Sequence, residues 1–225
     1  MKHGKKYLEC LKKYDGALSY ELKQALDLIK SMASAKFDET VDLSVKVNLK
    51  KSQSVRDTVV LPHQFRGEKR VLVFCKAEKE KEAQEAGAAF VGAEDLIEKI
   101  KGGWLDFDVA VATPDMMKDV GKLGMVLGRR GLMPNPKTGT VTFDLKGALS
   151  ELKKGRVEFR ADKTGVVHLA VGKVSMEPEK IAENVRVVVG EIRRKRPIDA
   201  KGDFIQTVSV ASTMGPGVWV SIKDE

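Results

Sequence analysis

The side chains that carry out most enzymatic chemistry are sparse in this sequence and do not stand at useful spacings. Cys10 and Cys75 are far apart, and neither belongs to a CxxC pair. The three histidines, His3, His63 and His168, are equally scattered. A zinc site or a disulfide framework is therefore not expected, and we find no paired carboxylates or activated nucleophile. The sequence predicts a protein that binds rather than catalyses, with no cofactor, metal ion or small-molecule substrate.

A nucleotide-binding α/β enzyme is the main alternative, and its expected phosphate-binding motif is missing. The apolar stretch Val71–Phe74 is typical of a buried strand, after which a GxGxxG motif should follow directly. Instead Cys75–Glu80 follows, and no glycine occurs until Gly87. Glutamates crowd this helix start and would repel a pyrophosphate. The later Gly121-x-x-Gly124 follows a predicted helix rather than a strand.

The charge of the chain favours a polyanionic partner. The 225 residues carry a formal net charge of +8, and a basic balance of this kind is typical of nucleic-acid binding. The excess is unevenly distributed, because residues 67–155 hold 15 basic and 14 acidic side chains while the two ends hold 25 and 18. No apolar run approaches the roughly 18 residues that span a bilayer, so no membrane partner is expected. Absence of a secretory signal and of paired cysteines favours the cytoplasm.

The two ends of the chain share one structural style. Leu22, Leu26, Ile29 and Ala33 predict a helix that begins near Ser19. Strict alternation over 41–49 predicts a half-buried strand, and a second strand is expected at 58–61.

The C-terminal part repeats that style. A strand at 157–161, a turn at 163–165 and a partner strand at 167–171 suggest a hairpin. Pro178 opens a helix that Pro197 stops, and two more strands are expected at 204–210 and 218–222. An antiparallel sheet with packed helices, an α+β arrangement, is therefore predicted from both ends of the chain.

The middle of the chain alternates short apolar strands with helices. Strands are expected at 71–74, 88–91 and 109–112, and helices at 77–86 and 93–101. This pattern predicts a parallel, three-layer α/β unit, Rossmann-like in architecture. We therefore expect a discontinuous α+β domain, residues 1–66 and 156–225, with an α/β domain of residues 67–155 inserted into it. The chain should cross between them at 66–68 and 154–156, and these crossings would act as a hinge.

Four segments resemble one known family in order and in spacing. They are 36–41 (KFDETV), 59–63 (VVLPH), 127–137 (LGRRGLMPNPK) and 213–217 (TMGPG). The chain thus resembles the L-one family of large-subunit ribosomal proteins, which belong to the mobile stalk, over nearly its whole length. Three positions depart from the family pattern: Arg129 stands where proline is usual, Asp57 where glycine is common and Gly217 where serine is frequent. The loop of residues 50–55 is also shorter than is usual in the family.

The resemblance implies two domains joined by a hinge, the first of which binds stalk ribosomal RNA in the large subunit. It also implies help in releasing deacylated tRNA from the exit site, and repression of translation by binding the messenger RNA of its own operon. A dedicated RNA-binding repressor that never enters ribosomes remains an alternative, because the same surface would bind both RNAs.

Two apolar side chains in these motifs are candidates for RNA contact. Met214 lies in the Thr213–Gly217 segment, which is either a plain hairpin turn or a turn whose glycines let backbone approach a ligand. Phe37 is either a core aromatic or, if exposed, a stacking surface. The resemblance favours contact for both. His168 should point away from the core by alternation, although a lone histidine is often only a hydrogen-bonded polar group.

The full set of candidate residues combines these motifs, the polar faces of the predicted strands and the resemblance. The candidate RNA-binding residues are Lys36, Phe37, Thr40, Lys46, Arg160, Lys163, Thr164, His168, Lys173, Ser209, Thr213, Met214, Gly215 and Pro216. The glycine-rich basic segment 118–141 suggests a secondary RNA contact or only a solvated loop; its candidates are Lys122, Arg129, Arg130 and Lys137. The run Arg193–Arg196 is explained by the helix macrodipole and is not counted.

Overall fold

The computed structural model describes residues 4–49, 55–67, 69–197 and 202–221. Two predicted positions fall outside them: Ile222, at the end of the last strand, and Glu68, at the first domain crossing. The chain forms two compact units, one of residues 1–65 and 157–225 and one of residues 66–156. The predicted fold class, an α+β domain with an α/β domain inserted, is confirmed.

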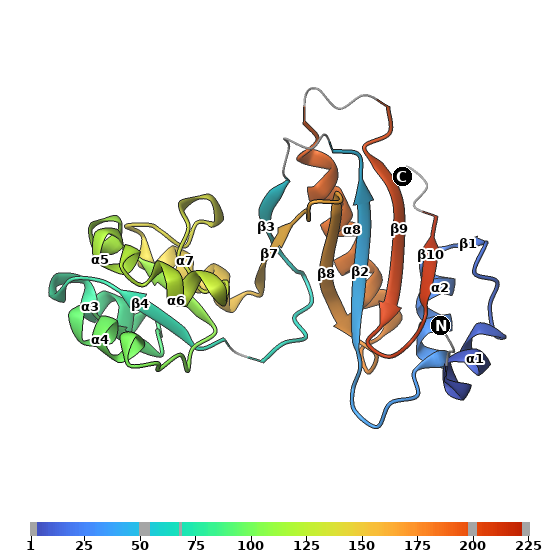
Figure 1. The fold of residues 1–225 in the computed structure, drawn as a ribbon, viewed down its shortest axis with the longest axis horizontal. Coiled ribbons are helices and arrows are strands. Elements are labelled where there is room, and N and C mark those ends of the chain that lie inside the picture. The colour runs from blue at the N-terminus through green and yellow to red at the C-terminus, as the bar shows by residue number, and fades with distance from the viewer. Residues whose placement is uncertain (1–3, 50–54, 68, 198–201, 222–225) are drawn as a thin grey trace. The chain divides into compact units, whose positions relative to one another are not determined.

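The first unit is built on a five-stranded sheet (Figure 1). Its strand order is β1-β10-β9-β2-β8; β1 pairs parallel to β10, and the other neighbours are antiparallel. The strands are β1 (Ser19–Tyr20), β2 (Thr40–Val47), β8 (Val166–Lys173), β9 (Ile205–Ser212) and β10 (Gly217–Val220). The helices are α1 (Lys5–Leu11), α2 (Leu22–Met32) and α8 (Pro178–Arg194).

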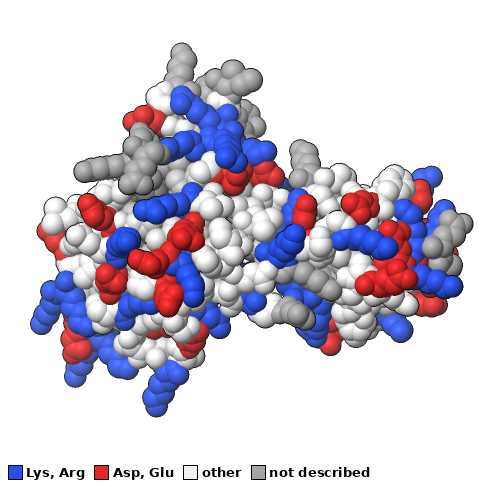
Figure 2. All heavy atoms as spheres, turned by 180° about the vertical axis from the view of Figure 1, so that it is seen from behind, with Lys and Arg blue, Asp and Glu red and all other residues white. Residues whose placement is uncertain are grey.

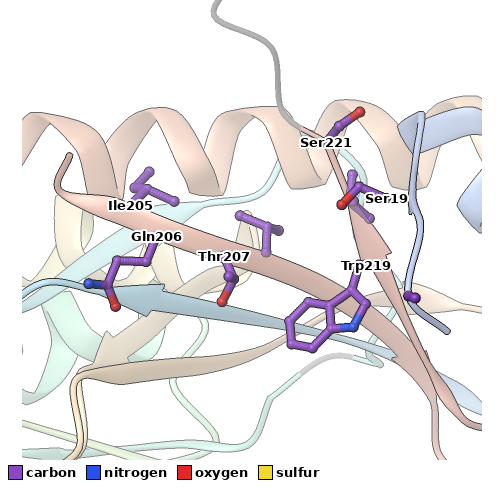
Figure 3. Close-up of a pocket in the computed structure, with 9 residues that line it drawn as sticks. Ser19, Ile205, Gln206, Thr207, Trp219 and Ser221 are labelled. Carbon is purple, nitrogen blue, oxygen red and sulfur yellow. The ribbon is translucent and has the colours of Figure 1, made fainter.

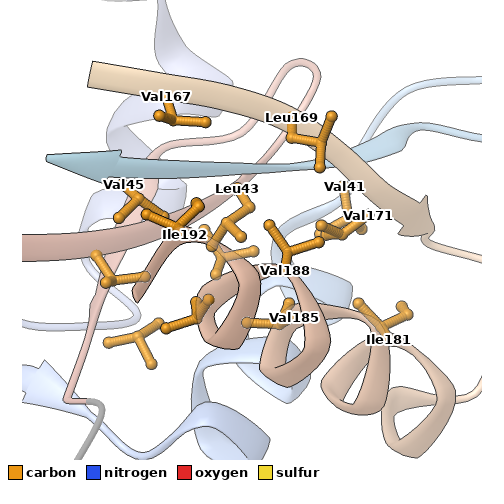
Figure 4. Close-up of a cluster of buried hydrophobic side chains, with 14 of the residues drawn as sticks. Val41, Leu43, Val45, Val167, Leu169, Val171, Ile181, Val185, Val188 and Ile192 are labelled. Carbon is orange, nitrogen blue, oxygen red and sulfur yellow. The ribbon is translucent and has the colours of Figure 1, made fainter. Parts of the chain in front are cut away.

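One face of this sheet packs on α2 and α8 to make the core of the unit. Alternation along β2 places Val41, Leu43 and Val45 on that face, where each is at most 1% exposed. Val185 and Val188 of α8 meet them from the opposite side (Figure 4). The apolar spacing of α8 therefore serves to bury one stripe of the helix against one face of the sheet.

The predicted hairpin of residues 157–171 is confirmed only at its turn, because its two strands pair with other strands. β7 (Arg156–Arg160) pairs with β3 (Arg56–Val60) in a separate two-stranded sheet, and β8 pairs with β2. A single bridge, Ala161 to Val167, joins the two segments. The buried face of β8 matches that of β2 along its length, with Val45 opposite Val167 and Leu43 opposite Leu169. Pairing β8 with β2 buries two matched apolar faces. This gain outweighs the advantage that β7, which is closer in sequence, would have had as a partner.

The second unit contains a three-stranded parallel sheet in the order β5-β4-β6. The strands are β4 (Val71–Phe74), β5 (Phe90–Gly92) and β6 (Val109–Ala112). The helical segments are α3 (Ala77–Glu85), α4 (Glu94–Lys101), η1 (Pro114–Met116), α5 (Met117–Gly121), α6 (Gly124–Arg129), η2 (Pro136–Thr138) and α7 (Leu145–Lys153).

Helices cover both faces of this parallel sheet, as a fully apolar strand requires. Leu72 and Phe74 of β4 pack in one cluster with side chains of α4, α5 and α6. Val71 and Val73, which point the other way, pack in a second cluster with side chains of α3 and α7. The predicted three-layer α/β arrangement is confirmed.

Candidate nucleic-acid interface

The outer face of the five-stranded sheet, opposite α2 and α8, carries short polar side chains. One row crosses the whole sheet, because Ser19 pairs with Trp219, Trp219 with Ser209, Ser209 with Ser44 and Ser44 with His168. The outward residues of β2, β8, β9 and β10 are Thr40, Asp42, Ser44, Lys46, Val166, His168, Ala170, Lys173, Thr207, Ser209, Ala211, Gly217 and Trp219. All of them are exposed or half-buried. We call this surface the outer sheet face.

His168 lies in the middle of the outer sheet face and points away from the core, as the alternation predicted. The His168 side chain is exposed, and its Nδ1 lies 3.0 Å from the Ser44 hydroxyl. Ser209 pairs with Ser44 on the other side and is half-buried. Three polar groups therefore stand side by side on adjacent strands.

At one end of the outer sheet face, two loops meet. The backbone amide of Thr40 donates to the Thr213 hydroxyl at 3.0 Å, and the Thr213 amide donates to the Thr40 carbonyl at 3.1 Å. Lys173 pairs with Thr40 in the sheet. Lys36 is exposed, Phe37 is 57% exposed and Met214 is 65% exposed. Six of the candidate residues thus gather at this end, and two large apolar side chains project from it into solvent.

Glu39 holds the two loops together from beneath. The residue is 2% exposed. One carboxylate oxygen accepts the backbone amides of Ser34 and Ala35 at 3.2 and 3.0 Å, and the other accepts the Met214 amide at 3.1 Å. A buried carboxylate with amide donors on both oxygens fixes the backbone on each side of the interface. We missed this role from the sequence, although Glu39 directly precedes an alternating strand.

The charged form of Glu39 is stabilised where it lies. Burial by itself would raise the pKa of the carboxyl, but hydrogen bonding outweighs burial and holds the pKa below its ordinary value. The backbone amides of Ser34, Ala35 and Met214 are the hydrogen-bond donors whose geometry the structure shows. Among the described residues, the buried Ser212 Oγ has no hydrogen-bond partner of good geometry, so we attribute the lowered pKa to the amides.

We expect Glu39→Gln to lower the free energy of unfolding by about 1–3 kcal/mol at pH 7, because one acceptor becomes an amide donor facing N–H groups. The folded pKa of Glu39 lies below its ordinary 4.5, so the stabilisation by its charge is present above that value and is lost as pH falls through the folded pKa. Denaturant unfolding at pH 7 and pH 3 should therefore show the difference between wild type and variant narrowing in acid. A difference that stays constant would contradict this role.

Gly215 closes the tight turn that begins at Ser212. Its amide donates to the Ser212 carbonyl at 3.1 Å, and a Cβ at this position would lie 2.5 Å from Ser212 Oγ. Pro216, in contrast, is buried. It shapes the turn, and its side chain does not reach the surface with Met214.

The opposite end of the outer sheet face is a basic turn. Lys46 Nζ donates to the Thr164 carbonyl, and Lys163 is exposed. The Asp162 carboxylate accepts the amides of Thr164 and Val166 at 2.8 Å each. Gly165 has φ +78°, and a Cβ there would lie 2.8 Å from the Val47 carbonyl oxygen. Glycine is needed because both the conformation and the space exclude a larger residue.

Arg160 ends β7, which belongs to the two-stranded sheet, and its side chain is exposed. The next residue, Ala161, bridges to Val167 of β8. That Arg160 shares one surface with His168 stays a prediction.

Ser44 and Trp219 are among the residues of the outer sheet face that sequence reasoning did not single out. The burial of β2 and β10 alternates, so each of these residues points away from the buried neighbours beside it in its strand. That alternation is the signal that could have placed both of them outward.

The opposite, helix-covered face of the first unit has a different character. Figure 2 shows acidic and basic side chains interspersed there, with Lys and Arg gathered near the C-terminal end of α8. Arg194 pairs with Glu191 at 2.6 Å within that last turn. Cations at this end of a helix are favoured by its macrodipole, which accounts for the cluster without a ligand.

The secondary candidates lie in the second unit. Lys122, Arg129 and Arg130 are exposed around α6, and Lys122 pairs with Asp119 at 2.8 Å. Lys137 lies in η2, and its side chain is outside what the structure describes. These residues stay predictions.

Within the described part of the chain, no group of three or more His, Cys, Asp or Glu side chains is arranged to hold a metal ion. None of the helices in that part combines the length and the apolar character needed to cross a membrane.

Comparison with known proteins agrees over almost the full length of the chain. Residues 29–216 match the ribosomal protein L1p/L10e family. The chain is 69% identical over 223 residues to the large ribosomal subunit protein uL1 of Treponema denticola, with 99% of each chain covered. It is 61% identical over 225 residues to that of Treponema pallidum, with both chains fully covered, and 54% identical over 224 residues to that of Leptospira biflexa, covering 100% of this chain and 97% of the relative. This chain therefore belongs to the ribosomal protein L1p/L10e family.

Proposed function

We propose that this chain is a structural component of the large ribosomal subunit and that its outer sheet face binds a folded segment of large-subunit ribosomal RNA in the stalk region. The observation that carries the proposal is the continuity of this surface. Hydroxyl groups and His168 occupy its middle, Lys46 and Lys163 stand at one end, and Phe37 and Met214 project at the other.

The chemistry of this surface suits RNA rather than a small substrate. Folded RNA is recognised through shape, 2′-hydroxyls and phosphates, with aromatic side chains on exposed bases or sugars. Short side chains on a sheet let backbone and hydroxyl groups come close to a ribose. The hydrogen bonds of Glu39 fix both loops before RNA binds, so less conformational entropy is lost on association.

Membership in a family of ribosomal proteins confirms that the chain is not an enzyme. The nucleotide-binding alternative also lacks support from the second unit, since β4 is followed by a helix rich in glutamate and not by a glycine loop. We infer no role for a nucleotide there.

Two finer roles follow from the proposed RNA site. We propose that the second unit contacts RNA through Lys122, Arg129, Arg130 and Lys137 and that the protein helps to release deacylated tRNA from the exit site. We also propose that the outer sheet face binds the messenger RNA of its own operon when that RNA folds like the ribosomal site. A repressor outside the ribosome would be absent from the large-subunit peak of a sucrose gradient, whereas a ribosomal component would sediment with it.

The dependence of binding on salt tests the proposed phosphate contacts. If the site neutralises about six phosphates, the logarithm of the association constant should fall with the logarithm of salt concentration with a slope of about −4 to −5. Lys36→Gln should weaken binding to a stalk fragment of large-subunit ribosomal RNA and flatten that slope by about one unit. Lys81→Gln, an exposed lysine of α3, is the matched control and should leave the slope unchanged. Equal slopes for wild type and Lys36→Gln would remove Lys36 from the site.

A further inference from the structure

A pocket of about 450 Å³ opens where β9 extends past the end of β10 (Figure 3). Its walls come from the start of β9, the end of β10 and the segment around β1. The residues that matter for its chemistry are Gln206, Thr207 and Trp219. The volume falls in the range of about 300–1,000 Å³ that is typical of pockets for small organic groups.

A β-bulge gives this pocket its polar wall. Lys46 pairs with Thr207 and Val47 pairs with Ile205, so Gln206 is the extra residue on β9. Ile205 packs toward the core. Gln206 and Thr207 instead lie on the same side of β9 as Trp219, away from α8 (Figure 3). Regular alternation would have turned Gln206 toward the helices, so the bulge is what brings its amide to the outer side.

The lining selects for a flat and neutral occupant. The indole of Trp219 is 43% exposed and offers a face for stacking. The Gln206 amide supplies a donor and an acceptor, and the Thr207 hydroxyl can do either. None of the nine described residues that line the pocket is charged, so it lacks the cations that a phosphate would need.

The pocket is continuous with the outer sheet face. Trp219 pairs with Ser209, which stands in the same row as Ser44 and His168. Thr207 pairs with Lys46, which belongs to the basic end of that face. RNA that lies along the row therefore passes next to the mouth of the pocket.

We propose that this pocket binds one unpaired base of the RNA held by the outer sheet face, with the base stacked on Trp219 and its polar edge hydrogen-bonded by Gln206 and Thr207. The inference rests on the proposed function of that face. Stacking on an aromatic ring with hydrogen bonds to the base edge is the usual way proteins recognise bases in RNA loops and bulges. Trp219 would then make the complex depend on an unpaired nucleotide at one position of the RNA.

Tryptophan fluorescence of the full chain tests this directly. The chain has two tryptophans, and Trp104 lies in the second unit against Phe90. In a Trp104→Phe background Trp219 is the only tryptophan, and the stalk RNA fragment should quench its emission by more than half. Trp219→Ala should weaken binding about tenfold and Trp219→Phe much less, because a phenyl ring keeps part of the stack. Leu18→Ala, an exposed apolar residue outside the pocket lining, is the control.

Abasic substitutions at the unpaired positions of the fragment complete the test. An abasic substitution at one of these positions should lower the RNA affinity about as much as Trp219→Ala does. It should also abolish the quenching of Trp219, and it should cause no further loss of affinity when combined with Trp219→Ala. If the RNA fragment binds wild type tightly without quenching Trp219, and Trp219→Ala binds it as tightly as wild type does, the proposed base-binding pocket is overturned. That result would leave the proposed RNA site on the outer sheet face unaffected. If the fragment fails to bind wild type, the proposed function itself fails. Equal losses for Trp219→Ala and Trp219→Phe with no quench would assign Trp219 a structural role and would also overturn the proposal.

Discussion

Met214→Asp is expected to weaken binding of stalk ribosomal RNA about a hundredfold and to leave the free energy of unfolding within about 0.5 kcal/mol of wild type. The side chain is 65% exposed at the tip of the turn, so its replacement costs the fold little. A carboxylate there would face phosphates, and like charges placed together at an interface cost several kcal/mol. Fluorescence anisotropy with a labelled stalk fragment measures the loss, and denaturant unfolding measures the stability.

Met214→Leu is the matched control for this change, because it keeps an apolar side chain of similar size. It should bind RNA within a few fold of wild type. If Met214→Asp binds like wild type, the turn does not touch RNA and the interface lies elsewhere. If both variants lose affinity together with stability, Met214 shapes the loop rather than contacts the ligand.

Phe37→Ala should lower RNA affinity about tenfold, while Phe143→Ala should leave it unchanged. Both phenylalanines are 57% exposed, so the two substitutions remove the same group at equal burial. Phe37 lies at the same end of the outer sheet face as Met214, and loss of a base or sugar stack costs about 1–3 kcal/mol. Phe143 lies in the second unit, where Lys79 Nζ is 5.1 Å from its ring centroid.

The same anisotropy assay compares the two alanine variants at one salt concentration. A loss of RNA affinity in Phe37→Ala alone supports RNA contact at the end of the outer sheet face that holds Phe37 and Met214. Equal affinities for the two variants would mean that Phe37 is an exposed apolar residue without a ligand.

Alternation made much of this fold predictable from sequence. Along β2, strict alternation assigned Val41, Leu43 and Val45 to the core and Lys46 to the opposite face, as the structure shows. The second unit was predictable for a different reason, because its strands are apolar on both faces and helices separate them. In both units the spacing of apolar residues along the segment indicates the secondary structure, and this spacing can be read from a short stretch of sequence.

Strand pairing was less predictable, because it depends on contacts that sequence distance does not reveal. The segment 163–165 does turn the chain, yet β7 and β8 pair with β3 and β2. The turn was right and the partner was wrong. To choose the correct partner, the apolar face of β8 would have to be matched with the apolar face of every other strand.

The candidate site was only partly accessible to sequence reasoning. Exposed positions such as Phe37, Met214 and His168 follow from motif and alternation. Glu39 was not found, since its burial depends on amides from two loops, one of which supplies Met214 from 175 positions away in the sequence. Gln206 was not found either, because a bulge breaks the alternation that would have assigned its direction.

The outer sheet face is proposed to be the surface that touches RNA, and the other proposals follow from that. Crosslinking in intact large subunits, with the linked peptides and nucleotides identified, is the decisive experiment. We expect crosslinks from residues 36–46, 163–173 and 207–219 to the RNA of the stalk region. Crosslinks confined to α8 or to the second unit, with those three segments unmodified, would contradict the proposal.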